Sequence, residues 1–108
     1  TPLCKARHMR PQRLTSDELA DGLSSIPLWR RVDETIARTI GFSSFPVAIE
    51  AVNRIAIVAE RLDHHPDIDV RWRTLKIMLS THDVAGLTHL DLDLAQEIDA
   101  IAQELGGS

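Results

Sequence analysis

The sequence has very few of the residues on which disulfides and cysteine-based metal sites depend. Its 108 residues include one cysteine, Cys4, and no tyrosine. A single cysteine cannot form an intramolecular disulfide, and zinc sites built mainly from cysteines are excluded. We therefore expect a reducing, cytoplasmic setting.

Long apolar runs and clustered basic residues are also missing. No apolar stretch approaches the roughly 20 residues that span a bilayer, so a membrane protein is not expected. The formal net charge is −4, and Lys76 is the last basic residue before an acidic C-terminal part. Because nucleic-acid surfaces need clustered lysine and arginine on one face, direct nucleic-acid binding is not expected either.

The length limits the architecture to one domain. A chain of 108 residues has room for a single hydrophobic core. Residues 1–8 lack the apolar segment of a signal peptide, and Met9 resembles a natural start. We interpret residues 1–8 as an expression remnant or a disordered N-terminus, and residues 9–108 as one domain.

Three helices are predicted from caps and apolar periodicity. Capping boxes at Thr15–Glu18 and Thr88–Asp91 mark the starts of the first and the last helix. A central helix is expected from Ser44 to Leu62, with proline in its first turn. Its predicted core-facing residues recur at helical spacing and are Phe45, Ala48, Ile49, Val52, Ala56, Ala59 and Leu62.

Four strands are predicted from β-branched residues and alternating polarity. Their expected ranges are 29–32, 35–42, 70–74 and 75–82, and a loop is expected over residues 63–69. The order α-β-β-α-β-β-α favours an α+β fold, with a four-stranded antiparallel sheet and three helices packed on one face. The free face or strand edge of so small a domain favours a homodimer or homotetramer.

Histidines and carboxylates concentrate in two short segments. His64 and His65 follow the central helix, and His82 is expected to end the fourth strand on the same side as Ser80. If these two ends meet, the imidazoles converge on one pocket. Unperturbed imidazole titrates near ~6.5, which suits general acid–base catalysis at neutral pH.

The spacing of these residues resembles the pterin-4a-carbinolamine dehydratase family. Its signature is matched in order by Glu60, His64-His65-Pro66, Trp72, His82 and Asp91. The segments Ser80-Thr81-His82-Asp83 and Gly86-Leu87-Thr88 are also typical of that family. The resemblance covers about residues 14–105, which is nearly the whole predicted domain.

The resemblance implies a reaction and a set of site residues. Water is expelled from a 4a-hydroxytetrahydropterin to give the quinonoid dihydropterin, without a metal or another cofactor. His64, His65 and His82 would form the catalytic cluster, with His64 and His82 as proton carriers. The family likeness implies substrate-binding roles for Asp63, Ser80, Thr81, Asp83 and Trp29, and supporting roles for Glu60 and Asp91.

Simpler readings of the same residues also exist. His64-His65 before a proline can act as favourable charge at a helix C-terminus, and Asp91 can fix a histidine tautomer or cap the last helix. A zinc site is disfavoured because adjacent histidines rarely chelate one ion. His89 is expected at the surface, and Trp72 is expected in the core.

Other functions of the same fold remain open at the level of sequence. The resembled family includes dimerisation partners of transcription factors, and another pterin pathway such as molybdopterin metabolism is also possible. A scaffold has no need for basic groups at His64 and His82, so the histidine trio favours the enzyme.

Overall fold

The computed structural model describes residues 11–108, and the expectation for residues 1–8 lies outside this range. Three α-helices and four strands follow one another in the predicted order, and a 3-10 helix that was not predicted lies between the last strand and the last helix. They are α2 (Ser16–Ser24), β1 (Arg30–Val32), β2 (Thr35–Gly41), α3 (Phe45–Leu62), β3 (Asp67–Arg71), β4 (Thr74–Leu79), η1 (His82–Val84) and α4 (His89–Glu104).

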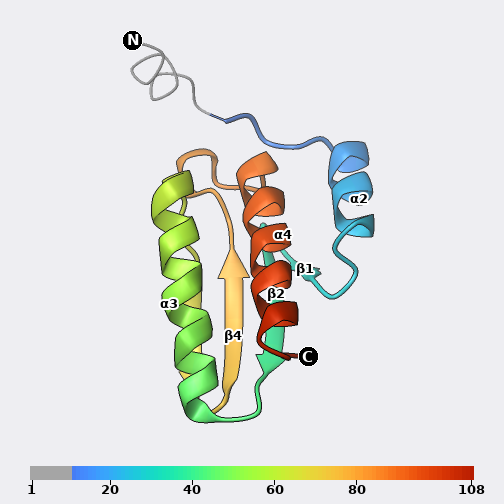
Figure 1. Cartoon of the computed structure of the whole chain (residues 1–108). Helices are drawn as coiled ribbons and strands as arrows, with labels where there is room; N and C mark the ends of the chain where they lie inside the picture. The colour runs from blue at the N-terminus through green and yellow to red at the C-terminus, as the bar shows by residue number, and fades with distance from the viewer. Residues whose placement is uncertain (1–10) are drawn as a thin grey trace.

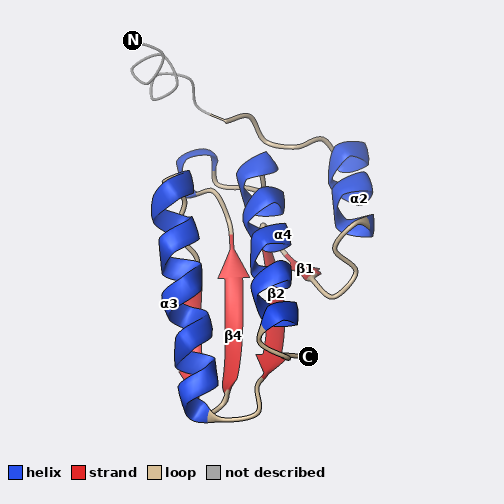
Figure 2. Ribbon diagram, in the orientation of Figure 1, coloured by secondary structure: helices blue, strands red, loops and turns tan. Residues whose placement is uncertain are grey.

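The strands form one antiparallel sheet in the order β1-β2-β4-β3. Helices α3 and α4 lie side by side across one face of this sheet, while α2 packs beside α4 (Figures 1 and 2). The predicted α+β fold and element order are confirmed. In the described part of the chain, no helix is both long and apolar enough to cross a membrane.

Alternation along the two central strands builds the core. The pairs Ile36↔Leu79 and Ile40↔Leu75 face the helices, and all four side chains are buried. Helix α4 covers them with an apolar stripe that includes Leu94 and Ile98. Burial of each such side chain stabilises the fold by about 1.5–3 kcal/mol, so the sheet and α4 are held together mainly by this layer.

The central helix begins where predicted, and Ala48 and Ala59 are buried as expected, but the buried face is rotated from the predicted one. Ser44 caps its N-terminus and Pro46 lies in its first turn. The side chains that enter the core include Ala51, Ile55 and Val58, whereas the predicted core residues Phe45 and Ala56 are exposed. The helix is apolar over more than half its circumference, so spacing alone could not select the buried face.

The second hairpin differs from the predicted strands. Strand β3 begins at Asp67, inside the predicted loop, and the chain turns at Trp72-Arg73 with Trp72 in the left-handed region (φ 55°). Trp72 is 71% exposed and stacks with the Arg73 guanidinium, so the expected core position is wrong. Strand β4 ends at Leu79, and His82 lies in η1 instead of in a strand.

A partly buried ion pair joins the sheet to the C-terminal half of α4. Arg38 lies on the core face of β2, and its Nη1 donates to Oδ1 of Asp99 at 2.5 Å. Trp29 donates from Nε1 to the same oxygen at 2.8 Å. A single carboxylate thus satisfies a buried guanidinium and a buried indole, which is the arrangement that buried charges require.

A second charged cluster lies at the turn between β1 and β2. Glu34 accepts hydrogen bonds from Arg31 and from Arg13, which precedes α2. The hydrogen bond from Arg31, with further contributions from the charges of both arginines, lowers the pKa of Glu34 despite some desolvation. The ion pairs therefore stabilise the fold above the ordinary pKa range of a glutamate, and this contribution is lost as pH falls through the lowered pKa.

We predict that Glu34→Gln lowers the melting temperature at pH 7, and that this difference shrinks as pH falls from 7 toward 3, because protonation of Glu34 at its lowered pKa removes the same ion pairs from the parent. Thermal unfolding followed by circular dichroism at several pH values between 3 and 7 measures the melting temperatures of the parent and the variant. Asp21→Asn on the exposed side of α2 is the control and should leave the pH dependence unchanged. A Glu34→Gln effect that persists undiminished at low pH would contradict the ion-pair explanation.

Candidate functional site

The end of α3 directs two adjacent histidines to opposite sides. Asp63 adopts the left-handed conformation (φ 50°), which aspartate tolerates better than most residues, and it ends the helix. The amide of His64 then bonds the carbonyl of Ala59 at 3.0 Å. His64 turns inward and is 8% exposed, whereas His65 is exposed and lies 2.5 Å from a carboxylate oxygen of Glu60.

A closed loop follows β4 and carries His82. The backbones of Thr81 and Gly86 pair with each other at 2.9 and 3.3 Å, which closes the base of the loop. His82 and Asp83 lie within it on η1, and both are exposed. The loop therefore presents His82 to solvent one residue after the backbone bridge at Thr81.

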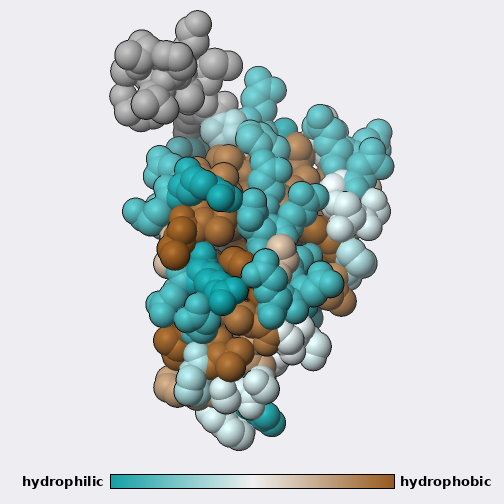
Figure 3. All heavy atoms as spheres, in the orientation of Figure 1, coloured by the Kyte–Doolittle hydropathy of each residue, from teal (hydrophilic) through white to brown (hydrophobic). Residues whose placement is uncertain are grey.

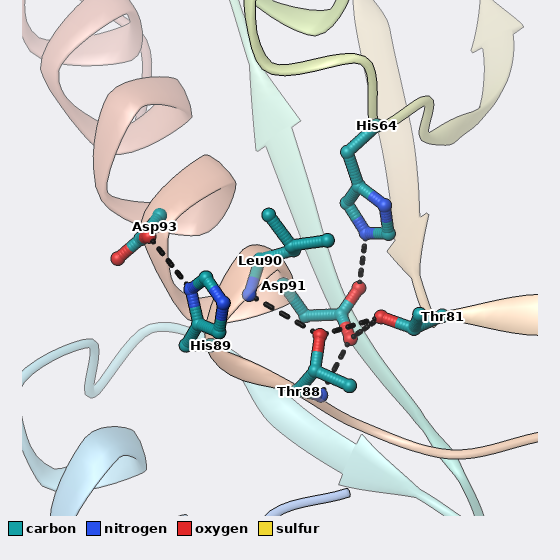
Figure 4. A network of polar contacts seen from close by, with 7 residues as sticks. All are labelled: His64, Thr81, Thr88, His89, Leu90, Asp91 and Asp93. Atoms are coloured by element: carbon teal, nitrogen blue, oxygen red, sulfur yellow. Dashed lines mark hydrogen bonds and ion pairs between the residues drawn. The ribbon is translucent and has the colours of Figure 1, made fainter. Parts of the chain in front are cut away.

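The N-terminus of α4 supplies a buried carboxylate. Thr88 caps the helix, and the Thr88 amide donates to Oδ2 of Asp91 at 3.0 Å. Thr81 donates its hydroxyl to the same Asp91 oxygen, Oδ2, at 2.8 Å. Nε2 of His64 lies 2.7 Å from the other oxygen, Oδ1 (Figure 4). Asp91 thus joins the ends of α3 and β4 to the start of α4. The capping role expected from the sequence is present, and Asp91 also contacts the histidine whose tautomer it was expected to fix.

This geometry limits the tautomer of His64. Oδ2 of Asp91 accepts from the Thr88 amide and the Thr81 hydroxyl, and Oδ1 faces Nε2 of His64. With an ionised carboxylate, the proton of the contact between Nε2 and Oδ1 is carried by Nε2. Nδ1 faces away from Asp91 (Figure 4), and within residues 11–108 no side-chain nitrogen or oxygen is buried without a partner. Nδ1 is therefore the nitrogen left accessible to a ligand.

The remaining predicted site residues do not all lie at the hydrogen-bond network around Asp91. Ser80 is half-buried beside Thr81, and Asp63 is exposed next to His64. Trp29 is buried and bonded to Asp99, about 12 Å along α4 from Asp91, so its polar group is not at this network. The hydroxyl of Thr81 is directed to Asp91, which leaves its proton unavailable for a substrate.

Thr88 belongs to the network but was not predicted as a site residue. Its hydroxyl lies 2.7 Å from that of Thr81, and the side chain is completely buried. The capping box predicted its bond within α4 but gave no sign of the contact across seven residues to Thr81. A clue is available in the sequence, because Asp91 occupies both the capping box and the family signature.

Two further features of the surface bear on possible ligands. In residues 11–108, no group of three or more histidines, cysteines or carboxylates is arranged to hold a metal ion. A shallow hollow of about 420 Å³ lies between α3 and α4 and contains none of the predicted site residues. Its lining residues are Leu62, Asp93, Gln96, Glu97 and Ala100. The histidine network lies outside this lining.

Comparison with known proteins finds a family profile and curated relatives that carry the same description. The sequence profile of the family described as pterin 4 alpha carbinolamine dehydratase matches residues 12–101. A Nocardia farcinica protein, provisionally named a pterin-4-alpha-carbinolamine dehydratase, is 47% identical over 95 residues, which cover 88% of this chain and 100% of that relative. A Roseiflexus protein with the same provisional name is 45% identical over 89 residues, which cover 82% of this chain and 96% of the relative.

Two solved structures described as pterin dehydratase or pterin dehydratase-like have a similar fold. The crystal structure of a transcriptional coactivator/pterin dehydratase from Brucella melitensis superposes with a TM-score of 0.81 at 35% identity and covers 84% of this chain and 99% of that one. A pterin dehydratase-like protein described as a RuBisCO assembly factor of the alpha-carboxysome has a TM-score of 0.60 at 21% identity, covering 68% and 88%. The latter likeness shows the fold alone. By its matching profile and its curated relatives, the chain belongs to the pterin-4-alpha-carbinolamine dehydratase family.

Proposed function

We propose that this protein dehydrates a 4a-hydroxytetrahydropterin to the quinonoid dihydropterin by histidine acid–base catalysis. The observation that carries the proposal is the buried His64–Asp91 pair, which keeps Nδ1 of His64 accessible. Family membership supplies the substrate class. The chain's own residues supply groups that can take up and release protons beside such a heterocycle.

The reaction requires two proton transfers and no change in oxidation state. The bond between C4a and the hydroxyl breaks while the electron pair of N5 forms a double bond to C4a. A proton added to the departing hydroxyl gives water, and N5 loses its proton, so the atoms balance as dihydropterin plus water. An acid and a base placed near C4a and N5 accelerate both transfers.

His64 is suited to accept the proton through Nδ1. The Asp91 carboxylate beside Nε2 stabilises the imidazolium that forms when Nδ1 becomes protonated, as an aspartate does in a catalytic triad. His82 is the second proton carrier and would protonate the hydroxyl from the exposed loop. His65, paired with Glu60, would orient the pterin, and Asp63, Ser80 and Asp83 are the neighbouring groups that can accept its N–H donors.

Replacing the two proton carriers tests this assignment. His64→Ala and His82→Ala should each lower the catalysed rate by about 100-fold or more, because each removes an acid or base from the transition state. Stopped-flow absorbance of 4a-hydroxytetrahydropterin breakdown, corrected for the spontaneous rate, measures the loss.

His89→Ala is the matched control, since His89 is exposed and its Nδ1 contacts Asp93 instead of the buried network. It should retain the parent rate, and thermal unfolding should show that all three variants are folded. If the parent protein gives no acceleration above the spontaneous rate, the proposed activity is wrong.

A binding role is the alternative from a different class. The Brucella relative is described both as a transcriptional coactivator and as a pterin dehydratase, so one fold can carry both descriptions. The discriminating variant is again His64→Ala together with His82→Ala. An enzyme loses dehydration, whereas a scaffold keeps its partner, because its binding surface does not need an accessible imidazole nitrogen.

We also propose that the protein is a homo-oligomer that assembles through α3. The face predicted to enter the core is partly uncovered at Phe45, which is 47% exposed, and Ile57 on the polar side of the same helix is 70% exposed. Figure 3 shows apolar side chains over α3 on the helix-covered side of the molecule. Exposed apolar patches of this kind mark subunit interfaces in soluble proteins, and a second copy of α3 offers a matching surface.

We predict that Ile57→Glu lowers the molecular mass in sedimentation experiments, because it places a charge in the proposed interface. Leu28→Glu is the control: Leu28 is similarly exposed at 64% but precedes β1, and its replacement should leave the mass unchanged. A parent protein that sediments as a monomer at micromolar concentration would contradict the proposal.

A further inference from the structure

We propose that Thr81 and Thr88 are positioning residues that act on His64 through Asp91. Their hydroxyl groups form a one-directional hydrogen-bond chain from the cap of α4 to the Asp91 carboxylate, whose other oxygen contacts the His64 imidazole. The catalytic consequence rests on the proposed dehydratase function, but the physical claim concerns the imidazole and can be measured without it.

The direction of the chain follows from its two fixed donors. The Leu90 amide donates to Oγ1 of Thr88 at 3.2 Å, so this hydroxyl is already an acceptor. The Thr81 hydroxyl donates to Oδ2 of Asp91 at 2.8 Å and has no second proton to give. The 2.7 Å contact between the two hydroxyls is therefore a donation from Thr88 to Thr81.

The chain ends on a carboxylate whose two oxygens are both engaged. Oδ2 accepts from the Thr81 hydroxyl and from the Thr88 amide, and Oδ1 faces Nε2 of His64. These donors hold the plane of the carboxylate, so Oδ1 has one direction in which to accept. That direction selects both the ring orientation and the Nε2–H tautomer of His64.

Burial makes the chain sensitive to the loss of any member. Thr88 and Asp91 are 0% exposed, Thr81 is 4% and His64 is 8%. Water has little access to replace a deleted hydroxyl, and hydrogen bonds of a buried chain polarise one another. Removing one hydroxyl therefore leaves a charged oxygen with an incomplete set of donors.

Thr81 also connects the two proposed proton carriers. Its backbone closes the loop that carries His82, and its side chain reaches the carboxylate that holds His64. One residue thus sets the position of the His82 loop and, through Asp91, that of His64. This double attachment explains why a threonine with no proton available for the substrate lies at the centre of the site.

The principal test is Thr81→Val, which keeps the shape of the side chain and removes its hydroxyl. We expect kcat to fall about tenfold, equivalent to one hydrogen bond to a charged group, while KM changes less than kcat. Thr81→Ser should restore most of the rate. Thr88→Val is a second, independent break in the chain and should lower kcat in the same direction.

A spectroscopic measurement separates positioning from a general loss of stability. Nitrogen-15 NMR of the imidazoles at alkaline pH should show the Nε2–H form of His64 in the parent, and a mixture of both neutral tautomers in Thr81→Val. Thr15→Val removes the equivalent capping hydroxyl of α2 and should change neither kcat nor the His64 signals.

Two results would overturn the proposal. In the first, Thr81→Val and Thr88→Val are folded and keep the parent tautomer of His64; in the second, Thr81→Ser is as impaired as Thr81→Val. If the parent protein has no dehydratase activity, the proposed function fails, and the NMR comparison alone then decides whether the hydroxyl chain positions His64.

Discussion

One buried carboxylate connects the elements that form the site. Asp91 has no exposed surface, and an ionised group in that position is stable only when its oxygens are fully hydrogen-bonded. Its donors come from the start of α4, the end of β4 and the turn after α3. Those segments must be packed together for the carboxylate to be satisfied, so the site is complete only in the folded domain. The position of His64 is a consequence of that requirement.

A second acidic residue further along the same helix also accepts hydrogen bonds from other elements of the fold. Asp99 receives Arg38 from β2 and Trp29 from the segment before β1. Between the two acids, Leu94 and Ile98 pack against the sheet without polar contacts. Apolar burial supplies most of the stability, whereas the paired charges at the two positions determine how α4 sits along the strands. These contacts fix the position of α4 on the sheet, and they thereby also fix the position of the site at its N-terminus.

The sequence predicted the features that depend on local chemistry. The capping boxes of α2 and α4, the proline in the first turn of α3 and the order of elements are all confirmed. Features that depend on three-dimensional packing were missed or wrong: the buried face of α3 was ambiguous because apolar residues occur around most of the helix. Trp72 was placed in the core because alternating residues in a turn look like a strand. Thr88 was overlooked because its second partner lies across a loop. The family signature identified His64 and Asp91, but only the structure shows which imidazole nitrogen is engaged.

Family membership and local geometry point to the same chemistry from different directions. The profile and the curated relatives belong to a family named for a pterin substrate, and the His64–Asp91 pair holds an imidazole with one nitrogen turned away from the carboxylate. The most direct test is a crystal structure with a stable dihydropterin bound. The account predicts a pterin ring between His64 and His82, with Nδ1 of His64 within about 3.2 Å of a ring nitrogen or of a water that contacts it. A pterin bound elsewhere, or a His64 ring turned so that Nδ1 contacts Asp91, would contradict it.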